Sequence, residues 1–359
     1  MKVQERNAAS PPILPLPPGS HLVSVCIPTF NAARWIRECL NSALAQTYRP
    51  LEILVVDDAS TDETVRLVRS IKDERIRVII NEENIGLTRN WNKCVQVSQG
   101  DFIKFLLHDD ILYPNCIEKM MQLFVSNNAL GLVFSPRDII LETEPENPIA
   151  ETWLRNYETL HTRFDVLAKI NHGRELFSKY LSGGFQGNWI GEPSSVLIKK
   201  ECFSHLGLFN TKLYQLCDME MWLRIMFFYD VGFISEKLSA FRLHLDSMSV
   251  SNLTSLRNCF DPLWLLESLS NSTEIKSVYP EIKALRASEL VRFSKTFLRN
   301  PATILRYLLT DRQTRQAFLF LPKWTLSAAV YAGKSLLRSA GFGSPRKNLN
   351  KPTRTQNRQ

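Results

Sequence analysis

Two neighbouring carboxylates, Asp109 and Asp110, lie just beyond the apolar run Phe102–Leu107. Two negative charges at the end of a buried strand are costly unless something offsets them. A divalent cation such as Mg²⁺ or Mn²⁺ would do so, and it could also bind the phosphate oxygens of a substrate. The alternative is that these acids cap a helix starting at Pro114. We favour metal binding because other polar side chains are expected at the same edge.

Further acids stand where chemistry is plausible. Asp57 and Asp58 follow the apolar run Leu51–Val56 and could either cap a turn or bind the base or ribose of a nucleotide. Asp218 stands at the start of an expected helix, where the helix dipole favours an ionised general base, and an N-cap is the alternative. Arg242 and His244 follow a candidate strand and could reach a diphosphate, or they could be ordinary surface residues.

The elements that must position these residues alternate between strands and helices. Apolar and β-branched runs predict strands, and apolar residues at helical spacing predict helices. Ser60–Glu63 has the pattern of a capping box before a helix at Thr64–Ile71. The expected strands are Leu22–Pro28, Leu51–Val56, Ile76–Ile80, Phe102–Leu107 and Leu130–Phe134, and the expected helices include Ala33–Ala45 and a segment around Leu87–Val95.

This alternation predicts an α/β fold with a mostly parallel sheet flanked by helices. Ligands of such sheets bind beyond the carboxyl ends of the strands. Four expected strands run into polar residues, namely Asn31, Asp57, Asn81 and Asp109 with their neighbours, so one sheet edge should carry the chemistry. Arg137–Leu167 looks like a long excursion from this pattern.

The composition and the missing motifs disfavour several other classes of protein. Neither a P-loop nor a Rossmann glycine motif occurs, so phosphate would be held by a metal and basic side chains. The seven cysteines include no C-x-x-C pair, and Cys26, Cys39 and Cys94 fall on apolar faces, which favours a reducing cytoplasm over a disulfide framework. We expect no nucleic-acid partner.

The ordered motifs resemble family 2 glycosyltransferases of the GT-A fold over Leu22 to about Ser247. The motifs are Val23-Ser-Val-Cys-Ile-Pro-Thr-Phe-Asn31, Gln46-Thr47, Val55-Val-Asp-Asp-Ala-Ser-Thr-Asp62, Asn84-Ile-Gly-Leu-Thr-Arg-Asn90, Gly100-Asp-Phe-Ile-Lys-Phe-Leu-Leu-His-Asp-Asp110, Gly207-Leu-Phe-Asn210, Asp218 before Trp222, and Arg242-Leu-His244. The resemblance implies an inverting transfer of a sugar from a nucleoside-diphosphate sugar to a hydroxyl acceptor. That acceptor would be a glycan or a lipid-linked glycan.

The resemblance also implies a role for each matching residue. Asp218 would deprotonate the acceptor, and Asp110, with Asp109 and His244 as further candidates, would bind the metal. Asp109 would also face the ribose or sugar. The donor would be contacted by Pro28, Phe30, Asn31, Asp57, Asp58, Arg89, Asp109 and Arg242. Pro28 and Phe30 would line the nucleobase pocket, and Asp58 would hydrogen-bond the base.

Two positions depart from the family pattern. The usual metal motif reads Asp-x-Asp, but Leu107 and His108 stand two residues before Asp109 and Asp110. Cys217 replaces the Glu that often precedes the base. A sugar-nucleotide-binding protein without turnover is the alternative function, because it would keep Phe30 and Asp58 without needing Asp218.

The sequence outside the resemblance suggests two flexible ends and a helical extension. We expect a proline-rich leader over residues 1–21, the GT-A domain over 22–250, a helical extension over 251–341 and a basic tail over 342–359. The extension would either pack on the catalytic domain or, with the tail, dock on the cytoplasmic face of a membrane. No stretch is long and apolar enough to suggest a membrane span.

Overall fold

The computed structural model describes residues 21–142, 147–183, 187–248, 250–251, 256–311 and 314–325. The chain divides into two compact units, Met1–Ser268 and Leu269–Gln359. Nearly all of the expected leader and the whole basic tail lie outside the described residues. The boundaries proposed for those two segments therefore stay predictions.

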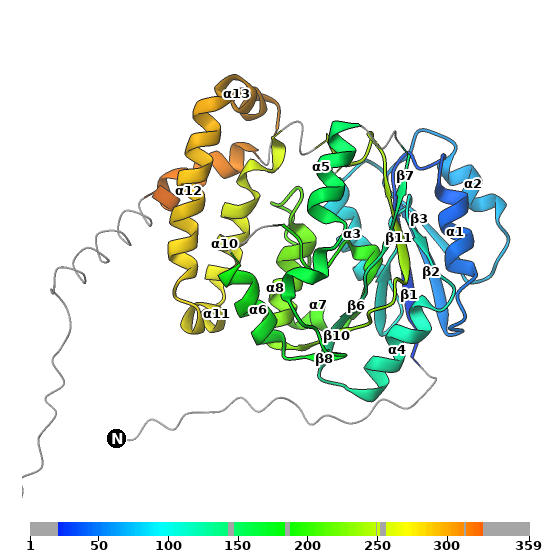
Figure 1. Ribbon diagram of the computed structural model, residues 1–359. Helices are drawn as coiled ribbons and strands as arrows, with labels where there is room; N and C mark the ends of the chain where they lie inside the picture. The colour runs from blue at the N-terminus through cyan, green and yellow to red at the C-terminus, as the bar shows by residue number, and fades with distance from the viewer. Residues whose placement is uncertain are drawn as a thin grey trace, which may run out of the picture. The chain divides into compact units, whose positions relative to one another are not determined.

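An eight-stranded sheet forms the centre of the first unit, in the order β3-β2-β1-β4-β9-β6-β10-β8 (Figure 1). Four of its seven strand pairings are parallel, which confirms the mostly parallel sheet. The remaining three are antiparallel, because β9 runs against both β4 and β6, and β8 runs against β10. The strands are β1 (Val23–Thr29), β2 (Leu51–Asp57), β3 (Ile76–Ile80), β4 (Phe102–Phe105), β6 (Leu130–Phe134), β8 (Ile170–Asn171), β9 (Val196–Lys199) and β10 (Asp230–Phe233).

The four parallel strands β1 to β4 end at one edge, as the alternating pattern predicts. Every residue of β1 and β2 is buried, as expected of strands covered by helices on both faces. In Figure 1, α1 and α2 lie on one side of these strands and α3 on the other. The helices of this part are α1 (Ile36–Leu44), α2 (Thr64–Ser70), α3 (Leu87–Val97) and α4 (Cys116–Ser126).

A second, three-stranded sheet brings distant candidate residues together. Its order is β5 (Ile111–Leu112), β11 (Ser239–Leu243) and β7 (Asp138–Leu141). Asp110 directly precedes β5, while Arg242 lies in β11 and His244 directly follows it. Because β11 pairs with β5, residues about 130 positions apart in the sequence meet beside the carboxyl ends of the main sheet.

Three sequence predictions are corrected. The Arg137–Leu167 excursion contains regular structure, namely β7, α5 (Pro148–Tyr157) and the 3₁₀-helix Leu160–Phe164. The capping box before α2 is wrong, because its N-cap Glu63 makes no side-chain cap and Asp62 accepts the Thr64 amide instead. The helix expected to begin at Pro114 begins at Cys116.

The rest of the first unit supplies the helix that carries Asp218. Its remaining helices are α6 (Gly173–Ser182), the 3₁₀-helix Pro193–Ser195, α7 (Glu201–Leu206), α8 (Cys217–Phe228), the 3₁₀-helix Arg257–Phe260 and most of α10 (Asp261–Asn271). In α8 every residue but two is buried, so this helix is packed on nearly all sides and holds its first turn firmly.

The second unit is helical over its described residues, which confirms the C-terminal helices, while the predicted limits of the extension stay predictions. It contains α11 (Thr273–Val278), α12 (Ile282–Arg299), α13 (Pro301–Thr310) and a further helix over residues 314–325. Ser272 caps α11 by accepting the Ile275 amide, and Pro301 stands at the start of α13, where its missing N–H costs nothing. Among the described residues, none of the helices combines the length and the apolar character that crossing a membrane requires.

Candidate active site

Asp110 is a fully buried carboxylate with one oxygen unsatisfied. Its Oδ1 accepts the Arg242 amide at 3.0 Å, whereas its Oδ2 has no hydrogen-bond partner among the described residues. Burial and the adjacent Asp109 charge raise the pKa of Asp110 well above its ordinary value. The helix-cap alternative fails, because Asn115 is the N-cap of α4. Asp110 is therefore placed to receive a cation or a proton.

Asp109 is paired with His244. Its Oδ2 lies 3.0 Å from Nε2 of His244, whose ring packs against Trp35 with the ring centroids 4.2 Å apart. Burial alone would raise the pKa of Asp109, but the hydrogen bond to His244 and the nearby His108 hold that pKa below its ordinary value. Nδ1 of His244 is buried without a partner among the described atoms.

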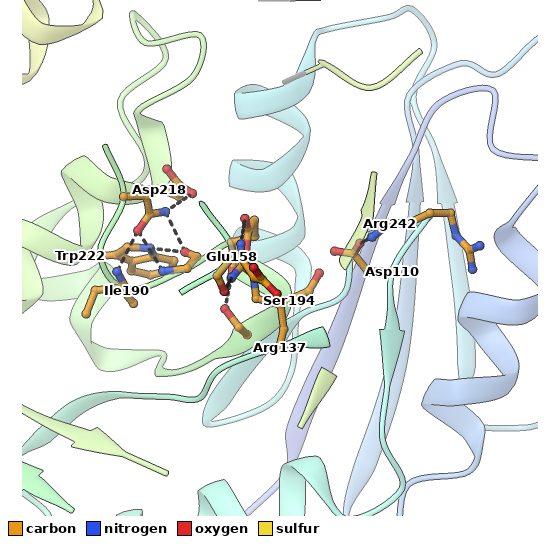
Figure 2. Close-up of polar contacts among 12 residues, drawn as sticks. Asp110, Arg137, Glu158, Ile190, Ser194, Asp218, Trp222 and Arg242 are labelled. Carbon is orange, nitrogen blue, oxygen red and sulfur yellow. Dashed lines mark hydrogen bonds and ion pairs between the residues drawn. The ribbon is translucent and has the colours of Figure 1, made fainter. Parts of the chain in front are cut away.

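The side chain of Arg242 points away from Asp110 (Figure 2). Its guanidinium pairs with Glu38 at 2.6 Å and Glu142 at 2.5 Å, and its Nε donates to the Asp109 carbonyl at 2.8 Å. Two ion pairs occupy this side chain, so a diphosphate would have to displace one of them. The structure thus gives Arg242 a positioning role for residues 109–110, and its contact with donor stays a prediction.

The acids after β2 are held by different groups. Asp57 accepts hydrogen bonds from the Thr29 hydroxyl and from both the amide and the hydroxyl of Ser60, so it fixes the turn after β2. Asp58 accepts the Asn81 carboxamide at 2.7 Å and the amides of Ile85 and Gly86, both at 2.9 Å. Asp58 therefore ties together the ends of β2 and β3.

Gly86 and Asn31 have backbone conformations that shape this edge. Gly86 has φ +87°, which lets its amide reach Asp58 just before α3 begins. Asn31 has φ +50°, and its side-chain oxygen accepts the Thr61 amide at 2.9 Å. Asn31 thus joins the turn after β1 to the segment before α2.

The remaining residues predicted to contact the sugar donor differ in how exposed they are. Phe30 is 44% exposed at the end of β1, which leaves its ring open for stacking. Pro28 is buried inside β1, and Arg89 is exposed on α3 with a hydrogen bond of 3.4 Å to the Ile85 carbonyl. All three lie at the edge formed by β1, β2 and α3, and their roles stay predictions.

Asp218 is a buried carboxylate in the first turn of α8. The N-cap alternative is wrong, because Leu216 is the N-cap and Asp218 is the second residue of the helix. Its Oδ1 accepts the Met219 amide at 2.6 Å, and its Oδ2 accepts the Asn188 carboxamide at 2.9 Å. Burial raises the pKa of Asp218 to about 7, although these hydrogen bonds oppose the shift. A carboxylate with such a pKa suits a general base at neutral pH.

Asn188 anchors a turn beside Asp218 through its side-chain hydrogen bonds. Its side-chain oxygen accepts the amides of Ile190 and Gly191, and its nitrogen also donates to the Gly191 carbonyl at 2.8 Å. Gly191 has φ +126°, and a Cβ there would lie 2.4 Å from the Ser195 hydroxyl, so only glycine fits. Trp222 of α8 donates to the same carbonyl at 3.2 Å.

The charge of Glu192 raises the pKa of both Asp110 and Asp218. Arg137 holds it through two bonds, of 2.7 and 2.9 Å, and also donates to the Glu158 carbonyl. The negative charge of Glu192 contributes to the raised pKa of Asp110 and of Asp218 alike, so it lies within electrostatic range of both. Sequence reasoning missed this pair, which joins residues 55 positions apart.

The buried Lys104 holds the turn at Ser194 next to Asp110. Lys104 in β4 is fully buried and donates to the Ser194 carbonyl at 2.7 Å, and the Ser194 hydroxyl accepts the Leu107 amide at 3.0 Å. Ser194 lies beside Asp110 in Figure 2. The antiparallel strand β9 thus begins near Asp110, and the segment before it reaches Asp218 through Asn188.

Asp261 secures the entrance to α8 from the other side. It is buried, and its carboxylate accepts the amides of Tyr214, Gln215 and Leu216 at distances from 2.6 to 3.1 Å. These three amides immediately precede the helix that carries Asp218. Asp261 is a second residue that local sequence patterns did not identify.

The residues present fit a divalent cation in part. The unsatisfied buried oxygen of Asp110 beside Asp109 is the kind of oxygen donor that Mg²⁺ and Mn²⁺ prefer. The described residues contain no group of three His, Cys, Asp or Glu side chains placed to hold a metal. His244 faces Asp109 through Nε2, so its ligand role stays a prediction. Substrate phosphates and water would have to complete the coordination.

Comparison with known proteins identifies the family of the chain. The model of the family "Glycosyl transferase family 2" matches residues 24–178. An uncharacterized protein of Mycobacterium tuberculosis is 33% identical over 264 residues, which cover 72% of this chain and 80% of that protein. An uncharacterized glycosyltransferase of Rickettsia conorii is 30% identical over 64% of this chain, which spans only 36% of that relative's length.

Solved structures show the same fold at low sequence identity. Staphylococcus aureus TarS 1-349 in complex with UDP-GlcNAc has a TM-score of 0.59 at 16% identity, covering 86% of this chain and 81% of that one. The mannosyltransferase PcManGT from Pyrobaculum calidifontis, in complex with GDP-Man and Mn²⁺, has a TM-score of 0.52 at 18% identity, covering 89% and 88%. The sheet with its acidic strand ends is that of a glycosyltransferase with the GT-A fold. The chain belongs to glycosyltransferase family 2 and is a glycosyltransferase.

Proposed function

We propose that this transferase moves a sugar, with inversion, from a nucleoside-diphosphate sugar to a hydroxyl of a glycan or lipid-linked acceptor. The observation that carries the proposal is Asp218, a buried carboxylate at the start of α8 with a pKa of about 7. Near neutral pH such a group can accept the proton of the attacking hydroxyl and is regenerated when that proton leaves to solvent. The helix N-terminus favours its ionised form.

The donor would bind along the carboxyl ends of β1 to β4. The exposed ring of Phe30 is available to stack on a nucleobase, and Asp58 already organises the neighbouring loop at that edge. TarS in complex with UDP-GlcNAc and PcManGT in complex with GDP-Man have this fold, which supports a nucleotide-sugar donor by analogy.

Asp110, with Asp109, would hold a divalent cation, Mg²⁺ or Mn²⁺. When bound, the cation would stabilise the charge of the nucleoside-diphosphate leaving group. The protein contributes a buried oxygen without a hydrogen bond and a fixed partner, because His244 orients Asp109 and the Arg242 amide orients Asp110. Ser194 lies beside the same carboxylate in Figure 2, and its hydroxyl accepts the Leu107 amide.

The base assignment is tested by Asp218→Asn. This variant keeps the shape of the side chain but cannot accept a proton, so transfer should fall by about 10²-fold or more while donor binding is retained. Donor binding is measured by calorimetry with the nucleotide sugar and Mn²⁺. Full transfer activity in Asp218→Asn would refute the assignment. Donor binding without any turnover by the wild type would instead favour the alternative, a sugar-nucleotide-binding protein.

We also propose that the enzyme works at the cytoplasmic face of a membrane. An acceptor on a lipid carrier would be presented there, and a peripheral protein could reach it without a spanning helix. The chain's overall excess of positive charge, +8, supports attraction to such a surface.

A further inference from the structure

The charge of the chain is divided sharply along the sequence. Residues 1–281 contain 28 Lys and Arg against 34 Asp and Glu, whereas residues 282–359 contain 16 Lys and Arg against only 2 acids. The net positive charge therefore comes entirely from the C-terminal segment. A surface that attracts this segment by its negative charge would not attract the catalytic unit in the same way.

Helix α12 exposes apolar side chains among these cations. Val291 and Leu298 are seven residues apart and therefore share one helix face, and they are 56% and 78% exposed. Lys295 lies between them on the same face, and the exposed Arg292 and Arg299 flank it, although Arg292 also pairs with Glu289 at 3.3 Å. The opposite face is buried through Ile282, Glu289 and Phe293.

The next helices repeat the arrangement. On α13, Leu305 and Leu309 are one turn apart, 47% and 79% exposed, with Arg306 beside them, while Ile304 is buried. In the helix over residues 314–325, Leu319 is 77% exposed. Exposed leucines of this kind are common one at a time, but exposed apolar residues beside exposed cations on both α12 and α13, followed by the exposed Leu319, point to a partner.

We propose that these helices form a membrane-docking surface for anionic lipid. We define this docking surface by its apolar residues Val291, Leu298, Leu305, Leu309 and Leu319 and by the cations Arg292, Lys295, Arg299 and Arg306. The apolar side chains enter the boundary between headgroups and acyl chains, and the cations meet lipid phosphates. A nucleic acid would match the charge but not the exposed leucines, so the combination favours a lipid surface.

This inference names the surface through which the proposed function reaches its membrane, but it is tested without measuring transfer. Full-length protein is floated with vesicles of phosphatidylcholine alone or with added phosphatidylglycerol. Binding is expected only with phosphatidylglycerol and should weaken as salt is raised. Failure to bind phosphatidylglycerol vesicles would overturn the proposal, whereas release of nucleoside diphosphate in the same preparation reports separately on the catalytic unit.

Two sets of variants test the two parts of the surface. Leu298→Ser combined with Leu305→Ser and Leu309→Ser should lower partitioning on the order of tenfold or more. A matched control is Val166→Ser with Ile170→Ser, two exposed apolar residues of the catalytic unit, which should bind as the wild type does. Unchanged partitioning of the triple variant would overturn the proposal, because the basic tail alone would then account for binding.

The charge variant separates lipid from nucleic acid. Arg292→Gln with Lys295→Gln and Arg299→Gln should lower partitioning on phosphatidylglycerol vesicles, whereas removing the same number of cations from α2 and its surroundings, with Arg66→Gln, Arg69→Gln and Lys72→Gln, should not. Thermal unfolding of every variant verifies that it is folded. Tight binding of an RNA oligonucleotide that displaces the vesicles and is unaffected by the leucine substitutions would refute the lipid assignment.

Discussion

Replacing Asn188 by alanine should shift the pH dependence of the reaction toward alkaline pH. The Asn188 carboxamide donates to the Asp218 carboxylate at 2.9 Å, and this bond favours the ionised form. A hydrogen bond to a charged group contributes about 1.5–3 kcal/mol, which corresponds to a pKa change of about 1–2 units. The pKa of Asp218, about 7 in the wild type, should therefore rise to about 8–9 in Asn188→Ala.

The consequence is a loss of activity that depends on pH. At pH 7 the ionised fraction of Asp218 should fall from about one half to between about one tenth and one hundredth, so kcat/KM should fall between about fivefold and fiftyfold. Much of this loss should be recovered above the new pKa. The measurement is kcat/KM for nucleoside-diphosphate release across the pH range, with the position of the acidic limb as the readout.

A matched control distinguishes this effect from general damage. Asn171→Ala removes another carboxamide of the same unit, one that bonds to the Ala168 backbone and to the Val231 carbonyl and touches no candidate site residue. Its acidic limb should stay in place. The reasoning is refuted if Asn188→Ala loses the same factor of activity at every pH, because Asn188 would then only support the turn at residues 188–191.

Three further predictions follow from buried contacts. Asp110→Asn should abolish the dependence of donor binding on Mn²⁺, measured by calorimetry with and without chelator, and an unchanged metal dependence would exclude Asp110 as a ligand. Arg137→Met should lower the free energy of unfolding by about 3 kcal/mol, because Glu192 loses the buried arginine with which it pairs. Urea unfolding measures this free energy, and a change near zero would contradict the expected loss of stability. Asp261→Ala should cost about 3 kcal/mol through the three amides that it leaves unpaired, and Asp261→Asn, which keeps an acceptor oxygen, should cost less.

The parallel half of the sheet was predictable because its signals are local. The strands β3 and β6 have the predicted limits, since each is a short β-branched or apolar run bounded by polar residues. The convergence of Asp58, Asn81 and Asp110 toward one edge follows from the direction of parallel strands alone. Hydrogen bonds between Asp58 and Asn81 and between Thr29 and Asp57 agree with that expectation.

The surroundings of Asp218 were not predictable from local patterns. The bond from Asn188 to Asp218 spans 30 positions, and those from Tyr214 to Leu216 toward Asp261 span more than 40. Neither has a characteristic spacing in the sequence. The Asn188-Trp-Ile-Gly191 segment does signal a turn, but only the antiparallel insertion of β9 shows that this turn faces Asp218.

The ion pairs of Arg242 could not be predicted from the sequence for a different reason. A basic residue near a strand end is compatible with phosphate binding, and the sequence offers no means of telling that Glu38 and Glu142 occupy the guanidinium. These partners come from α1 and from the end of β7, which tertiary packing alone brings together. Whether Arg242 positions Asp109 and Asp110 or binds the sugar donor is therefore decided by its neighbours and not by its residue type.

We propose that this chain cleaves a nucleotide sugar at a site built from Asp110 and Asp218. The most direct test incubates the full-length protein with a panel of nucleoside-diphosphate sugars, with Mn²⁺ or with chelator, and measures released nucleoside diphosphate. We predict release from at least one donor, dependent on the metal, and its loss in both Asp110→Asn and Asp218→Asn. Release that persists with chelator and in both variants would contradict the assignment of this site.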